Sequence, residues 1–152
     1  MKNNIKIGIP RALLYYKYIA MWEEFFKQLG CEVLKSPATN KEIVSRGLSI
    51  AIDESCLAVK IFLGHVDYIK DKVDYVFVPR IESLIKKEFL CSKFMGLPDI
   101  VRNSFENINV LDFNISIKFF IQIFSQPIKI GRTSSISVYK KKLFFTVCFQ
   151  IY

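Results

Sequence analysis

Two cysteines lie where a thiolate could do chemistry. Cys56 lies at the start of a predicted helix, and Cys91 lies in a polar loop that contains Lys86 and Lys87. The positive end of a helix dipole favours a thiolate, and thiolates are the usual ligands of iron–sulfur clusters. A gap of 35 residues is not by itself a cluster motif, so structural thiols are the alternative. Cys31, at the start of a predicted strand, is expected to be a small core residue.

Two arginines predict a site for an anion. Arg11 and Arg80 each follow a short β-prone run, and residues 36–40 follow another. In open α/β sheets, ligands bind beyond the carboxyl ends of the strands, and a guanidinium holds phosphate or carboxylate through two parallel hydrogen bonds. The alternative is that each arginine caps a helix or pairs with a nearby carboxylate.

Other signatures of catalysis are missing. The segment from Gly8 to Arg11 lacks the second and third glycines of a dinucleotide-binding loop. Phosphate-loop, HExxH and Ser–His–Asp patterns are also absent. The one histidine, His65, falls inside a predicted helix, where a packed or surface role is more common than a role as ligand or base. Hydrolysis and nucleotide-dependent oxidoreduction are therefore poorly supported.

The elements that must position these residues alternate between β-prone runs and amphipathic helices. Strands are predicted at residues 5–9, 31–34, 75–78 and 109–113, and helices at 13–29, 40–52, 56–70 and 98–105. This order predicts an α/β, Rossmann-like fold with a mostly parallel sheet, helices on both faces, and residues 75–78 as a central strand.

Two details of the helices follow from residue types. Pro10 suits the first turn of a helix, and the spacing in the second helix predicts that Ile43, Val44, Leu48 and Ile52 all face inward. Asn40 or Thr39 would cap that second helix.

The overall size and hydropathy fit one soluble domain. The chain has 152 residues, enough for one sizeable core. No secretory signal is visible, and the longest uncharged apolar runs, residues 119–128 and 143–152, are each ten residues long, whereas a membrane span needs about 18 or more. We expect a cytoplasmic protein that does not enter a membrane.

The net charge of +8 is unevenly distributed. Residues 1–112 hold 16 of the 22 basic residues and all 14 acidic ones. The remaining six basic residues fall in residues 113–152, which contain no carboxylate. We therefore predict a domain over residues 1–115 and an irregular, basic tail over residues 116–152. The run Tyr139–Phe145, basic and aromatic, is compatible with a nucleic-acid-binding module, although a solvated basic patch is the simpler interpretation.

The stretch from Ile5 to Ile100 resembles the acyl-CoA dehydratase activase-related proteins, whose fold is similar to that of 2-hydroxyacyl-CoA dehydratase subunits. The matching segments, in order, are Ile7–Leu13, Leu29–Val33, Ser36–Glu42, Asp53–Lys60, Phe62–Val66, Val76–Arg80 and Cys91–Asp99. Seven ordered segments in register are much more specific than any single motif. The stretch over which they lie, from Ile5 to Ile100, covers about two thirds of the chain.

The resemblance implies a Rossmann-like fold and a 4Fe–4S cluster held by cysteine thiolates. Its ligands would include Cys56 of Asp53–Cys56 and Cys91 of Cys91–Phe94. In the related dehydratases, an ATP-dependent activator delivers one electron to such a cluster, and the electron makes a ketyl radical from a 2-hydroxyacyl thioester. An activator or a dehydratase subunit would be the partner, and an acyl-CoA the substrate.

The chain departs from the family's pattern in two ways. Ala58 and Ser92 stand where the cysteine motifs often carry proline, which alters backbone stiffness and not ligand chemistry. The resemblance also fades near Asn114, as a frameshift or a truncated gene would produce. Two domain cysteines do not complete a four-thiolate cluster, so Cys31, Cys148, another chain or a non-protein ligand would supply the rest. The alternative is a truncated remnant without chemistry.

Overall fold

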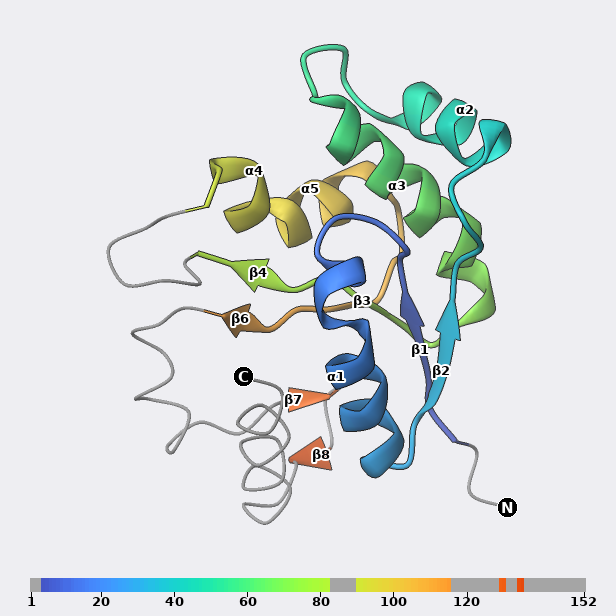
Figure 1. Ribbon diagram of the computed structural model, residues 1–152, viewed down its shortest axis with the longest axis vertical. Coiled ribbons are helices and arrows are strands. Elements are labelled where there is room, and N and C mark those ends of the chain that lie inside the picture. Colours follow the sequence, from blue (N-terminus) through green and yellow to red (C-terminus); the bar gives the residue numbers. More distant parts are fainter. Residues whose placement is uncertain (1–3, 83–89, 116–128, 131–133, 136–152) are drawn as a thin grey trace.

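A four-stranded parallel sheet organises the chain. The computed structural model describes residues 4–82, 90–115, 129–130 and 134–135. Its main sheet contains β1 (Lys6–Ile9), β2 (Glu32–Lys35), β3 (Tyr75–Phe77) and β5 (Val110–Leu111), in the order β2-β1-β3-β5 (Figure 1). This arrangement confirms the predicted α/β, Rossmann-like fold, with β3 in a central position.

Helices cover both faces of this sheet because alternate residues of each strand point to opposite sides. Ile7 and Ile9 of β1 pack with Trp22 and Phe26 of α1 (Tyr15–Gln28). Val76 of β3 belongs to the opposite core, with residues of α3 (Leu57–Ile69) and α5 (Leu97–Ser104). Between Ile7 and Ile9, Gly8 faces that second side, where an added Cβ would lie 2.9 Å from Val73 Cγ2.

The first helix begins later than expected. Pro10 lies in a loop over residues 10–14 and not in the first turn of a helix, so that prediction is wrong. Within this loop, Leu13 has a φ of +57°. This left-handed conformation changes the direction of the backbone between β1 and the start of α1. At the other end, Gly30 adopts a φ of +77° and stops α1 as the sequence predicts.

Helix α2 (Lys41–Ile50) packs on α3 through two glycines. A Cβ on Gly47 would lie 1.9 Å from the carbonyl oxygen of Lys60, and a Cβ on Gly64 would lie 2.0 Å from that of Ile43. This contact buries Ile43 and Gly47. It leaves Leu48 50% and Ile52 67% exposed, so the expectation that both face inward is wrong. The close approach of the backbones, and not the hydrophobic pattern alone, sets the rotation of α2.

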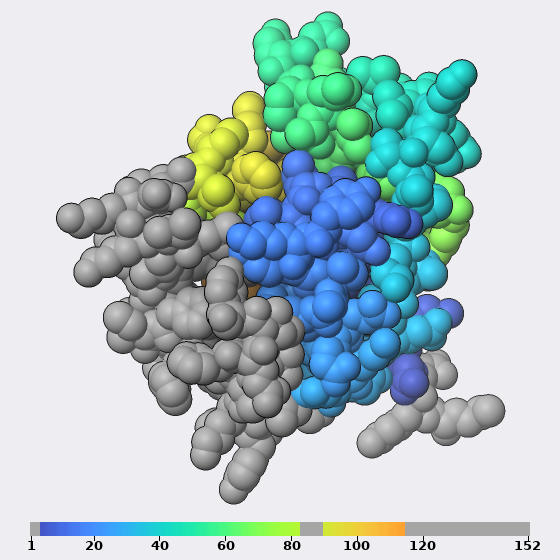
Figure 2. Space-filling view, viewed as in Figure 1, coloured from blue at the N-terminus to red at the C-terminus, as the bar shows by residue number. Residues whose placement is uncertain are grey.

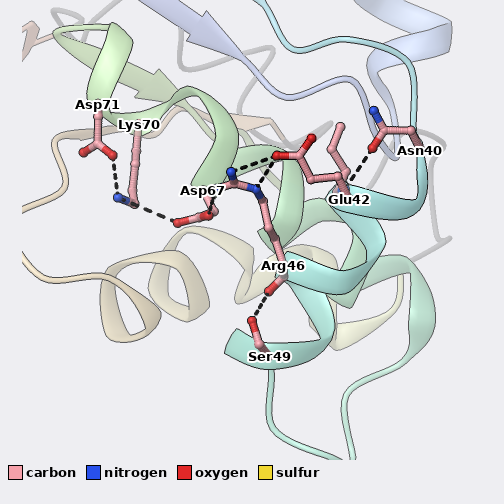
Figure 3. Close-up of polar contacts among 8 residues, drawn as sticks. Asn40, Glu42, Arg46, Ser49, Asp67, Lys70 and Asp71 are labelled. Atoms are coloured by element: carbon pink, nitrogen blue, oxygen red, sulfur yellow. Dashed lines mark hydrogen bonds and ion pairs between the residues drawn. The ribbon is translucent and has the colours of Figure 1, made fainter.

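Polar contacts fasten the same pair of helices. Asn40 caps α2, since its Oδ1 accepts a hydrogen bond from the backbone N–H of Ile43 at 2.9 Å. Arg46 of α2 forms ion pairs with Glu42 on its own helix and with Asp67 on α3 (Figure 3). Arg46 and Glu42 are exposed and Asp67 is half-buried, and ion pairs with an exposed partner contribute little to stability.

The structure contains several short elements that the sequence did not predict. β4 (Arg80–Ile81) pairs in parallel with β6 (Asn114–Ile115), and the single-turn α4 (Ser92–Met95) comes before α5. A 3-10 turn, η1 (Lys70–Lys72), ends α3. In the segment 116–152, β7 (Lys129–Ile130) and β8 (Ser134–Ser135) form an antiparallel pair, while the aromatic and basic run 139–145 lies outside the described residues.

None of the helices in the described part of the chain is long and apolar enough to cross a membrane.

Candidate functional site

The predicted site residues lie on the carboxyl side of the sheet. β1 pairs with β2 on one side and with β3 on the other. The order in which successive strands are added to the sheet therefore reverses between β1 and β3. In sheets of this kind, such a switch point is the usual place for a ligand. The loop over residues 10–14 follows β1 there, and residues 36–40 follow β2.

An apolar recess lies at this switch point. Its lining comes from the loop after β1, from α1 and α3, and from the segment that follows β3: Ile9, Pro10, Ala12, Leu13, Leu14, Trp22, Phe62, Phe77, Pro79, Ile81, Phe94 and Leu97. Leu13, the residue with the positive φ, is one of these lining residues.

Beside β1 and β2, a buried polar network surrounds His65. The imidazole is 0% exposed. Its Nδ1 lies 2.8 Å from Oγ of Ser36, and its Nε2 lies 3.0 Å from Oγ1 of Thr39. One ring nitrogen of a neutral imidazole donates and the other accepts, and a hydroxyl can serve either. The expected packed role of His65 agrees with this geometry.

Burial, with a smaller contribution from the positive charge of Arg11, lowers the pKa of His65 from 6.5 to about 4. Desolvation disfavours the charged imidazolium, as does a nearby cation. The ring is therefore neutral at pH 7.

Arg11 is held at the end of β1 by its backbone and by an aromatic ring. Its N–H donates to Oγ of Ser36 at 2.7 Å, and its guanidinium carbon lies 5.8 Å from the centre of the Tyr15 ring. The Nε atom is buried, and no hydrogen-bond partner for it is present in the described part of the chain. The guanidinium thus keeps donors for a further group.

Arg80 has protein partners instead. Its Nη2 donates to Oδ2 of Asp99 at 2.7 Å, and its Nη1 donates to the carbonyl oxygen of Met95. The hydrogen bond from Arg80 holds the pKa of Asp99 below its usual value, and Arg102 adds to this effect. Arg80 therefore links β4 to α4 and α5. This is the alternative considered from the sequence, in which the arginine pairs with a nearby carboxylate. Asp99, which α5 carries in its first turn, was not singled out from the sequence.

Both candidate thiols occupy the position just before a helix. Cys56 is the N-cap of α3 and Cys91 the N-cap of α4, and both are exposed. Sγ of Cys91 accepts a hydrogen bond from the backbone N–H of Lys93 at 3.4 Å. Cys31 packs partly buried against the core beneath α1, as expected, while Cys148 lies outside the described residues.

The two thiols come from different connections on one side of the sheet. α3 leads back to the start of β3, so its first residues lie beyond the carboxyl ends of the strands (Figure 1). The same argument places Cys91 on that side, because α4 and α5 lead back to the start of β5. In Figure 2, α2 and the first part of α3 (cyan to green) project from one end of the molecule. The described residues contain no group of three or more His, Cys, Asp or Glu that could hold a metal ion.

The fold and this edge define a Rossmann-like α/β protein in which the carboxyl side of the sheet carries an arginine, a buried histidine network and two exposed thiols. The model of one protein family, the CoA enzyme activase uncharacterised domain, matches residues 6–143. The chain therefore belongs to this family, which confirms the resemblance to acyl-CoA dehydratase activase-related proteins. No curated protein and no solved structure matches it.

The family match includes residues 116–143, most of the segment that we assigned to a separate tail. The division of the chain at residue 115 stays a prediction.

Proposed function

We propose that this protein is the iron–sulfur component of a system that dehydrates 2-hydroxyacyl-CoA thioesters, and that Cys56 and Cys91 are two ligands of a 4Fe–4S cluster. The observation that carries the proposal is the placement of both thiols. They are exposed, each comes just before a helix, and both lie on the carboxyl side of the sheet.

The chemistry of these two thiols fits cluster ligands. Cys56 stands at the N-terminus of the 13-residue helix α3, where the helix dipole stabilises negative charge. The N–H of Lys93 donates to the sulfur of Cys91, and hydrogen bonds to cluster sulfurs are one means by which proteins set the reduction potential. When bound, the cluster would accept and donate one electron.

The described residues supply two ligands, whereas a 4Fe–4S cluster commonly takes four thiolates. The remaining ligands would come from Cys148, from another chain or from a non-protein ligand. A separate ATP-dependent activator would be the electron donor, and an acyl-CoA bound by the partner dehydratase would be the substrate.

Anaerobic reconstitution with iron and sulfide tests the proposal. We expect a broad absorption near about 400 nm in the wild-type chain. It should be lost in Cys56→Ser and in Cys91→Ser, and retained in the matched control Cys31→Ser, because Cys31 packs against the core. A folded protein that stays colourless, or a cluster that survives both serine variants, would overturn the assignment. The first result would favour a member of the family without redox chemistry.

A further inference from the structure

Arg11 differs from the other arginines that the structure describes. Arg46 pairs with Glu42 and Asp67, and Arg80 pairs with Asp99. Arg102 pairs with Asp99 and Asp112. Among the residues in the described ranges, Arg11 alone of these four has no carboxylate within ion-pair distance.

The surroundings of Arg11 are neutral, and part of its guanidinium is withdrawn from water. Nε is buried without a hydrogen-bond partner in the described part of the chain. Its guanidinium lies near the Tyr15 ring, its backbone N–H donates to Ser36, and its charge acts on the imidazole of His65, which is neutral at pH 7. A partly buried cation without a counterion is unfavourable, and an anion that accepts its hydrogen bonds removes much of that cost.

The position of Arg11 suits a ligand. It follows β1 on the side of the sheet where α/β proteins bind their ligands. The hydrogen bond from its backbone to Ser36 and the contact with Tyr15 restrain it before any ligand arrives. This restraint reduces the entropy that binding would otherwise cost.

We propose that Arg11 is the charged anchor of an oxyanion site beyond the carboxyl ends of β1 and β2, which binds the phosphate or carboxylate group of a small ligand. The planar guanidinium offers such a group two parallel hydrogen bonds. The site needs neither iron nor the two candidate thiols, so it stands apart from the function proposed above.

His65 provides a specific signal for this binding. It is the one histidine of the chain, so its ring resonances in an NMR spectrum need no further assignment. Arg11 is one cause of the low pKa of His65. An anion bound to Arg11 offsets that charge, and the pKa of His65 must then rise.

The test is a titration of the iron-free full-length protein at constant ionic strength. Sodium phosphate and sodium acetate are added separately, with sodium chloride replaced in step, while the ring carbon–proton signals of His65 are followed. We expect a saturable shift with at least one of the two anions and a titration curve of His65 that moves to higher pH. The anion that binds more tightly identifies the ligand group as phosphate or carboxylate.

Two variants of Arg11 and one control decide the outcome. Arg11→Gln should weaken binding by about tenfold or more, since charge-assisted hydrogen bonds are lost. Arg11→Lys keeps the charge without the planar pair of donors, so it should bind several-fold more weakly than wild type. Arg46→Gln, which removes an arginine already paired with carboxylates, should leave binding unchanged. No saturable shift in the wild type, or equal binding by wild type and Arg11→Gln, would overturn the proposal.

Discussion

At the scale of single residues, the neighbours of a side chain decide what its charge can do. Arg11 and Arg80 have the same side chain and a similar position after a strand. The guanidinium of Arg80 donates to Asp99 and to the carbonyl of Met95, whereas the buried Nε of Arg11 has no hydrogen-bond partner in the described part of the chain. The anion site expected from both arginines is therefore proposed for Arg11 only.

The histidine network predicts a dependence of stability on pH. The pKa of His65 is about 4 in the folded protein against 6.5 as its ordinary value. The unfolded chain therefore binds a proton that the folded protein does not bind, over the range from about pH 6.5 to about pH 4. The folded state loses stability as the pH falls through this range, and the loss is on the order of 1–3 kcal/mol in total.

Urea denaturation of wild type and His65→Gln at several pH values measures this contribution. Glutamine can hydrogen-bond to the hydroxyls of Ser36 and Thr39 but does not titrate. We expect the difference between the two free energies of unfolding to change between pH 7 and pH 4, in favour of the variant at the lower pH. A constant difference across this range would show that His65 titrates normally in the folded protein.

At the scale of the elements, the packing of α2 on α3 depends on the absence of two side chains. A Cβ on Gly47 or Gly64 would overlap a carbonyl oxygen of the facing helix. Because both atoms belong to backbones within helices, neither can move without separating α2 from α3. That movement would also disturb Ile43, which is 0% exposed.

We expect Gly47→Ala and Gly64→Ala each to lower the free energy of unfolding by roughly 1–3 kcal/mol, as overpacking of a tight contact does. Gly96→Ala is the matched control. Its φ is −90° and its added Cβ would lie 3.5 Å from the carbonyl oxygen of Ser92, an ordinary contact. Thermal and urea unfolding of the three variants measure the effect. If Gly47→Ala were as stable as Gly96→Ala, the helices would not be in the contact described here.

At the scale of the whole molecule, the cores and the candidate thiols are separate. The two buried clusters lie on the two faces of the sheet and contain the large apolar side chains. Cys56 and Cys91 are exposed outside these clusters. The fold should therefore form without any metal, and a cluster would add function to an existing structure.

The double variant Cys56→Ser/Cys91→Ser tests this separation. Under iron-free conditions its free energy of unfolding should lie within about 0.5 kcal/mol of the wild-type value, as is usual for surface substitutions. The measurement is urea denaturation followed by circular dichroism, with Cys31→Ser as the comparison because Cys31 packs against a core. A large loss of stability in the double variant would indicate that the thiols support the fold itself.

The amino-acid sequence by itself determined the alternation of strands and helices, the parallel sheet and the central place of residues 75–78. These follow from local hydrophobic periodicity and from glycine and proline signals, which need no knowledge of distant residues. It also placed Arg11, Arg80 and residues 36–40 at one edge, because parallel strands end on the same side.

Only the tertiary structure decided what those residues contact. The rotation of α2 follows from Gly47 and Gly64, which meet the backbone of the partner helix, and hydrophobic spacing predicted the wrong inward residues. The pairing of Arg80 with Asp99, and the meeting of His65 with Ser36 and Thr39, join residues 19 to 29 positions apart. Contacts of this kind depend on how whole elements pack, and no local pattern in the chain encodes them.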